Sequence, residues 1–230
     1  MRSPLLLRLV TACVVIVLAA CGTPRDPEGT LDRVTGGTLR VGVSANDPWV
    51  VLGDGEPRGV EVELVERLAA ELDAEVEWIE GTVDDLAAAV HVREVDLIVA
   101  GLTSSSGISS EAALTHPYVT TQVVVGADGA LEDVAGMEVA VERGSEAAGL
   151  IEKTDAVPVE VDDVATADAP VAVDDYLLTD LGLDDTGITL LETDHVMAVP
   201  HGENAWLVKL ERFLLDHAAI VDRLLDEVDA

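Results

Sequence analysis

The sequence predicts an α/β fold, and three observations support this prediction. Strand-like and helix-like segments alternate through residues 38–100, which is typical of a βαβαβ unit with a parallel sheet. Hydrophobic residues make up 49% of the chain while aromatic residues make up 3%, so the apolar residues are mostly Ala, Val and Leu. The 230 residues suffice for one mid-sized domain or for two small lobes with buried cores.

The first half of the predicted fold follows from hydrophobic periodicity. Alternating apolar residues indicate strands, and apolar residues three or four positions apart indicate the buried face of a helix. The pattern predicts a strand at 38–44, a helix at 60–72, a strand at 75–80, a helix at 83–92 and a strand at 95–100. Gly101 closes the last of these strands.

A second, smaller set of elements follows a Ser-rich segment. The pattern predicts strands at 119–125, 137–141, 157–161, 171–173, 188–191 and 195–200, a helix at 145–151, and one or two amphipathic helices within 204–228. The connection between the strands ending near 161 and beginning near 171 consists mainly of Ala, Thr, Asp and Pro. We expect no normal amphipathic crossover helix there, so this part of the fold is shortened.

The chain is strongly acidic, with 13 Lys and Arg against 45 Asp and Glu and a formal net charge of −32. A phosphate backbone would be repelled by such a surface, so we expect no nucleic-acid partner. The hydrophobic fraction is too high for a disordered acidic chain. Two cysteines are too few for a disulfide framework. The acidity is compatible with a saline habitat or with a general bias in surface charge.

The N-terminus has the pattern of an export signal. A basic start precedes an apolar run at 9–18, which is shorter than the roughly 20 residues of a membrane span. The run ends in Leu-Ala-Ala-Cys, which resembles a bacterial lipobox. We expect residues 1–20 to be a lipoprotein signal peptide and Cys21 to carry a lipid at the extracytoplasmic face of the cell membrane. An ordinary signal peptide that contains a cysteine is the alternative.

Residues 21–37 are rich in Gly, Pro, Thr and charged residues. Such a composition is typical of a flexible linker. We therefore predict that this segment is a tether between the lipid anchor and the folded protein.

Several stretches together resemble one protein family: GTLRVGVS, GVEVELVERLAAELDAEVEWIEG, EVDLIVAGLTSSSGISSEAALTHPY and HVMAVPHGENAWLVKLERFL. In this order they resemble bacterial extracellular solute-binding proteins of family 3. The resemblance covers most of residues 38–216. It implies a two-lobed fold of the type II periplasmic binding-protein kind, with lobe one at 38–126 and 194–230 and a shortened lobe two at 127–193. Ligand would bind in the cleft between the lobes, without a cofactor.

The resemblance also implies a function and partners. Such proteins deliver a small polar solute, here one that is amino-acid-like or a cationic amine, to the permease of an ABC importer. Five residues after Thr103, amino-acid binders normally carry an Arg that grips the ligand's carboxylate, but this chain has Ile108. We therefore expect a free amino acid to bind poorly and a cationic or neutral polar solute to bind better.

The remaining candidate ligand contacts are transferred from the family position by position. Trp49 would lie at the cleft mouth, and Asp174, which Asp175 follows, would accept a hydrogen bond from a ligand ammonium. The other candidates are Gly101 and Thr103 at a strand end, and Glu142, Gly144 and Ser145 in lobe two. Each has a structural alternative: packing for Trp49, a strand end and helix cap for Gly101 and Thr103, and a helix N-cap for the Asp pair.

Two other functions remain open. A dehydratase exists on this fold, but the missing Arg weakens a grip on an anionic substrate. The five His are scattered without a metal-ligand spacing, and neither a nucleophile motif nor a phosphate-binding Gly loop is present, so we expect no enzyme activity and no metal. The more serious alternative is a degenerate binding domain that senses a ligand or docks a partner at the cell surface.

Overall fold

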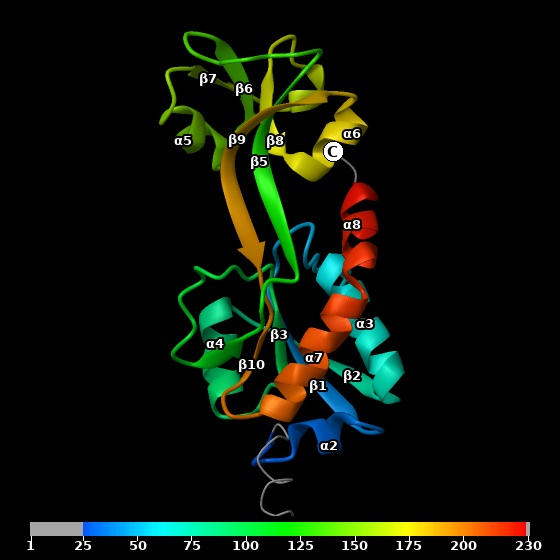
Figure 1. Cartoon of the computed structure of the whole chain (residues 1–230). Helices are drawn as coiled ribbons and strands as arrows, with labels where there is room; N and C mark the ends of the chain where they lie inside the picture. Colours follow the sequence, from blue (N-terminus) through cyan, green and yellow to red (C-terminus); the bar gives the residue numbers. More distant parts are fainter. Residues whose placement is uncertain (1–24, 229–230) are drawn as a thin grey trace, which may run out of the picture.

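The computed structural model describes residues 25–228 and shows two lobes, each built on its own five-stranded sheet (Figure 1). The predicted two-lobed α/β fold is confirmed. Two long strands, β5 (Val119–Ala127) and β9 (Asp184–His195), connect the lobes. The predicted signal peptide and the lipidation site at Cys21 lie outside the described residues. Within the described range, no helix is long and apolar enough to cross a membrane.

Lobe one is organised around a sheet of order β2-β1-β3-β10-β4. Its strands are β1 (Thr38–Val43), β2 (Glu75–Glu80), β3 (Leu97–Val99), β4 (Ala112–Leu114) and β10 (Ala198–Pro200). β1 pairs in parallel with β2 and with β3. The connecting helices are α3 (Val60–Leu72) and α4 (Val83–His91). The predicted βαβαβ unit is therefore confirmed.

Helices cover both faces of this sheet. Leu97 and Val99 of β3 pack in one buried cluster with α3 and α7 (Asn204–Asp216), whereas Ile98 packs in a second cluster with α4. This division follows from the alternation of side chains along a strand. The C-terminal helix α8 (Ala218–Asp226) packs beside α3 and also contacts β5.

Lobe two has the sheet order β7-β6-β8-β5-β9. The parallel strands are β6 (Glu138–Glu142), β7 (Val157–Val161) and β8 (Val171–Asp174), and β5 pairs antiparallel with β8 and β9. Helix α5 (Ala147–Ile151) packs in one buried cluster, while η1 (Val164–Thr166), η2 (Asp175–Leu177) and α6 (Leu178–Leu181) pack in another.

The connection between β7 and β8 in lobe two is short. One turn of 3-10 helix, η1, stands between β7 and β8, where a crossover helix would otherwise cover the sheet. As a consequence, Val157 and Val159 of the edge strand β7 are exposed.

Strand β5 belongs to the second sheet along its whole length, because it pairs with β8 and β9. The sequence places this strand in lobe one, with the boundary at Gly126. The chain instead leaves lobe one just before Val119, where the backbone N–H of Tyr118 donates to the carbonyl of His195 over 3.0 Å. The second crossing lies near His195, where β9 ends.

The tether prediction is wrong for the described residues 25–37. Helix α2 (Thr30–Val34) lies within this segment, and Val34 is fully buried. One carboxylate oxygen of Asp26 accepts hydrogen bonds from the backbone N–H groups of Ala205 (2.7 Å) and Trp206 (3.0 Å) at the start of α7. These contacts fasten the segment to lobe one.

A second group of contacts holds the same segment. The carboxylate of Glu203 accepts hydrogen bonds from the backbone N–H groups of Glu28 and Thr30, and Arg33 forms an ion pair with Asp96. All these partners are distant in sequence. Composition alone therefore indicates a linker although the chain folds there.

Candidate functional site

A polar cleft of about 230 Å³ lies where the two lobes meet. It is lined from lobe one, from the two connecting strands and from lobe two. The lining residues are Asn46, Asp47, Pro48, Trp49, Gly101, Thr103, Thr121, Thr193, His195, Glu146, Asp174 and Tyr176. Parallel strands β1, β3, β6 and β8 all end toward this region, and clefts at the carboxyl ends of parallel strands are common ligand sites.

The charge of the cleft is negative. Asp47 approaches from lobe one, whereas Glu146 and Asp174 approach from lobe two. None of the lining residues is a Lys or Arg. A cation that enters the cleft therefore meets carboxylates from both lobes, and an anion meets no positive side chain of the lining.

Asp174 stands at the end of β8, where the chain turns into η2. The pKa of its carboxyl is raised to about 6, chiefly by burial and with a contribution from the neighbouring carboxylates of Asp175 and Glu146, against a lowering effect of the hydrogen bond from Tyr176. The Tyr176 hydroxyl donates this bond to Asp174 over 3.3 Å, and burial together with Asp174 raises the pKa of the tyrosine as well. The carboxyl is thus held in a setting that favours a positive partner.

The lobe-one wall of the cleft depends on a glycine. Gly101 has φ +58°, and a Cβ at this position would lie 2.4 Å from the side-chain nitrogen of Asn46 and 2.5 Å from the Trp49 ring. The Asn46 amide in turn donates a hydrogen bond to the carbonyl of Ala100 over 3.0 Å. A side chain at Gly101 would displace both lining residues.

His195 joins the two connecting strands beside the cleft. Its ring nitrogen Nε2 lies 3.0 Å from the hydroxyl of Thr121, and its ring centroid lies 3.9 Å from that of Trp49. Burial lowers the pKa of His195 to about 4, so the ring is neutral near pH 7 and adds no positive charge. Its Nδ1 atom is buried without a hydrogen-bond partner within the described residues.

Four of the predicted site residues are brought together by the fold: Trp49, Gly101, Thr103 and Asp174 all line the cleft. Trp49, however, is only 5% exposed, and His195 lies against one face of its ring. Its packing interpretation therefore fits the structure better than an open aromatic platform, and Tyr176 is the more accessible aromatic side chain.

The other predicted site residues lie elsewhere. Ile108 is 4% exposed in the core of lobe one, where it packs in the cluster of α4, so its assignment as a ligand contact is corrected. Glu142, Gly144 and Ser145 are not among the lining residues. The Ser145 hydroxyl donates to the carbonyl of Glu142, and the tight turn that they form presents Glu146 to the cleft instead.

Several lining residues escaped the sequence analysis. Asp47 directly precedes the predicted Pro48-Trp49 turn and Tyr176 follows Asp174 by two positions, so both have a signal in the sequence. Thr121, Thr193 and His195 had no such signal, because their place at the cleft depends on the pairing of β5 with β9.

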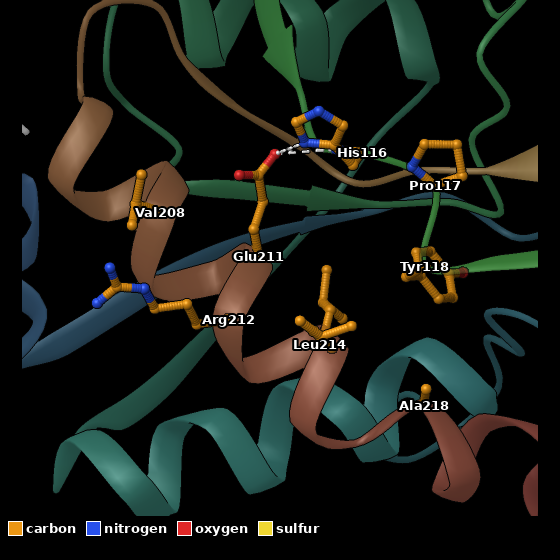
Figure 2. A pocket seen from close by; sticks show the side chains of 9 residues that line it. His116, Pro117, Tyr118, Val208, Glu211, Arg212, Leu214 and Ala218 are labelled. Carbon is orange, nitrogen blue, oxygen red and sulfur yellow. Dashed lines mark hydrogen bonds and ion pairs between the residues drawn. The ribbon is translucent and has the colours of Figure 1, made fainter.

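A larger hollow of about 360 Å³ lies on lobe one, between the segment 116–118 and helices α7 and α8 (Figure 2). Its lining is mostly apolar, and its carboxylate, Glu211, already accepts hydrogen bonds from the backbone and the ring of His116. The cleft is the better candidate because polar groups from both lobes converge there. Among residues 25–228, no three or more His, Cys, Asp or Glu side chains are grouped to hold a metal ion.

Two α/β lobes, joined by paired strands and lined at their junction by polar groups, are the architecture of two-lobed periplasmic solute-binding proteins. Residues 39–219 match the bacterial extracellular solute-binding proteins, family 3, and the chain belongs to this family. The resemblance stated from sequence is thereby confirmed, together with the extracytoplasmic character that the family description gives.

A relative and two solved structures illustrate the similarity. The chain is 28% identical over 146 residues to the arginine-binding extracellular protein ArtP of Bacillus subtilis, covering 61% of this chain and 56% of that protein. The chain thus matches little more than half the length of its curated relatives.

The solved structures share the fold. An ancestral cationic amino acid solute-binding protein, AncCDT-1, superposes with a TM-score of 0.68 at 20% identity, covering 86% of this chain and 98% of that chain. An ancestral cyclohexadienyl dehydratase, AncCDT-3, gives a TM-score of 0.61 at 20% identity, covering 86% and 95%. At these identities the likeness shows the fold alone, which binding proteins and an enzyme share.

Proposed function

We propose that this chain is the solute-binding component of an ABC-type importer and that its ligand is a small organic cation, an amine or a guanidine. One observation carries the proposal: Asp47, Glu146 and Asp174 line the cleft while no Lys or Arg does. Cys21, outside the described residues, is the expected point of attachment to the membrane.

The charges around the cleft favour a cation strongly. Charge-assisted hydrogen bonds from an ammonium or guanidinium to carboxylates are shorter and stronger than neutral ones. A cation beside Asp174 would also relieve the unfavourable burial that raises the pKa of this carboxyl to about 6. The acidic surface of the whole chain, with its net charge of −32, raises the local concentration of cations near the cleft.

A ligand carboxylate has no comparable partner in the cleft. On entering the cleft it would lose its hydrating water and find no positive side chain in the lining to replace it. It would also face three carboxylates. The proposal therefore favours an amine or guanidine over the zwitterionic amino acid of the same side chain. The arginine-binding relative and the ancestral cationic amino acid binder are compatible with the cationic part of this proposal.

Replacing Asp174 with Asn tests the proposal. The probe is agmatine, which is arginine without its carboxylate, and its affinity is measured by isothermal titration calorimetry near pH 7.5. We expect Asp174→Asn to weaken agmatine binding about tenfold or more, because a hydrogen bond to a charged group is replaced by one to a neutral amide.

The matched control is Asp175→Asn. It removes the same charge from the next residue along the chain, whose side chain does not line the cleft. This control should change agmatine affinity only slightly. Equal affinities for the wild type and Asp174→Asn would sink the proposed role of Asp174.

The degenerate binding domain remains the second candidate function, and the replacement of a crossover helix by η1 favours it. A degenerate domain that only docks a partner would show no change in melting temperature with any cation of a small-solute panel, whereas an import receptor is stabilised by its ligand through mass action.

A further inference from the structure

Glu61 is a fully buried carboxyl group beside the cleft. It lies in the first turn of α3 and is 0% exposed. None of its hydrogen-bond partners among the described residues is a Lys, Arg or His. Burying a carboxyl group without a positively charged partner is costly, so Glu61 needs specific hydrogen bonds to offset its burial.

Those contacts connect the cleft to the first crossing between the lobes. One oxygen of Glu61 accepts a hydrogen bond from the backbone N–H of Gly101 over 2.8 Å, and the other accepts the hydroxyl of Tyr118 over 2.7 Å. Gly101 is a lining residue of the cleft, and Tyr118 directly precedes the connecting strand β5.

The same carboxyl is linked to the second crossing. The backbone N–H of Glu61 donates to the carbonyl of Trp49 over 3.1 Å, and the Trp49 ring packs edge-on against Tyr118 and at a tilt against His195. The backbone N–H of Tyr118 donates to the carbonyl of His195 at the end of β9. We call Trp49, Glu61, Tyr118 and His195 the hinge cluster.

We propose that Glu61 is a positioning residue for the cleft, which holds the Gly101 strand end and the start of β5 in the relative placement that ligand binding requires. Glu61 is not itself a lining residue of the cleft, so it acts through Gly101 and Tyr118. The test of this inference by agmatine affinity rests on the proposed function. Its test by the distance between the lobes does not.

The protonation behaviour of the cluster supports this role. Burial raises the pKa of Glu61 to about 7, against the lowering effects of the hydrogen bonds from Gly101 and Tyr118. Burial and the Glu61 carboxylate raise the pKa of Tyr118 well above its ordinary value. The tyrosine therefore stays a hydrogen-bond donor at every pH at which the protein would work.

Two substitutions separate positioning from simple stability. Tyr118→Phe removes the hydroxyl and leaves one Glu61 oxygen without its donor. Glu61→Gln keeps the size of the side chain and also its two contacts. The amide oxygen can accept a hydrogen bond from Gly101, and the amide nitrogen can donate one to the Tyr118 oxygen. Glu66→Gln, on the exposed face of the same helix, is the matched control.

Each variant is examined well below its melting temperature. Agmatine affinity is measured by calorimetry, and the distance between the lobes of the unliganded protein is measured by fluorescence energy transfer between one label on each lobe. We expect Tyr118→Phe to weaken agmatine binding about tenfold and to broaden the interlobe distance distribution. Glu61→Gln should retain most of the affinity, and Glu66→Gln should match the wild type.

A folded Tyr118→Phe protein with wild-type affinity and a wild-type distance distribution would overturn the inference. Failure of wild-type protein to bind agmatine would count against the proposed function instead. The distance measurement still decides the role of Glu61 in that case, because it requires no ligand.

Discussion

At the scale of single residues, carboxyl groups and aromatic side chains line the cleft, and no Lys or Arg is among the lining residues. Asp174 is the central example, since burial raises the pKa of its carboxyl to about 6 and only the Tyr176 hydroxyl donates to it among the described side chains. Such an arrangement is unfavourable in the empty protein. Groups held at a cost to stability are frequent at functional sites.

This cost predicts a pH-dependent effect of Asp174→Asn on the empty protein. The pKa of Asp174 is raised on folding, from 3.8 to about 6, so its contribution to stability is full below pH 3.8 and is lost as the pH rises through 6. Asn has no such loss. We expect the melting temperature of the variant relative to wild type to be higher at pH 7.5 than at pH 4.

Differential scanning calorimetry without ligand at the two pH values measures this difference. A wild-type comparison at each pH removes the contributions of the other groups, including His195, whose lowered pKa acts with the opposite sign. A difference in melting temperature that does not vary with pH would show that Asp174 titrates normally.

At the scale of elements, periodic segments were predictable and segments fixed by distant contacts were not. Helix α3 follows directly from Leu64, Leu68 and Leu72 on one face, and all three are buried. Helix α2 has only five residues in a Gly- and Pro-rich segment, and it is held by partners more than 60 residues away. Local sequence carries no information about those partners.

The N-terminal segment provides a prediction at this scale. Asp26 accepts hydrogen bonds from backbone N–H groups of α7 and, through its other oxygen, from Leu31 over 2.8 Å. The free N–H groups of a first helical turn are stabilised by such a carboxylate, and its loss costs about 1 kcal/mol or more. Asp26→Ala should therefore lower the free energy of unfolding by about 1–2 kcal/mol.

Urea unfolding measures the free energy of unfolding of Asp26→Ala and of the control Asp32→Ala. Asp32 is exposed on the neighbouring helix α2, so this control removes the same charge without removing the contacts to α7. Equal free energies of unfolding for both variants would contradict the attachment of the segment through Asp26.

At the scale of the whole molecule, the candidate site exists only because two lobes meet. Asp174 and Gly101 reach the cleft from different sheets, and family resemblance rather than periodicity predicted that they would come together. The same resemblance placed Ile108 at the ligand, whereas its apolar side chain is buried in the core of lobe one. Gly101 and Asp174 line the cleft, whereas Ile108, Gly144 and Ser145, which were transferred in the same way, do not.

The hinge was also beyond local sequence. Residues 119–125 were predicted as a strand, but their membership of the second sheet depends on pairing with a segment some 70 residues later. His195 and Thr121 meet only through that pairing, over 3.0 Å. These contacts bring the connecting strands into the lining of the cleft.

The proposed function requires that the cleft bind a cation and have no place for a carboxylate. Isothermal titration of the wild-type protein with agmatine, arginine and glutamate tests it most directly, because agmatine and arginine share a guanidinium and differ in the carboxylate. We expect agmatine to bind at least as tightly as arginine and glutamate not to bind. Binding of glutamate, or binding of arginine much tighter than that of agmatine, would contradict it.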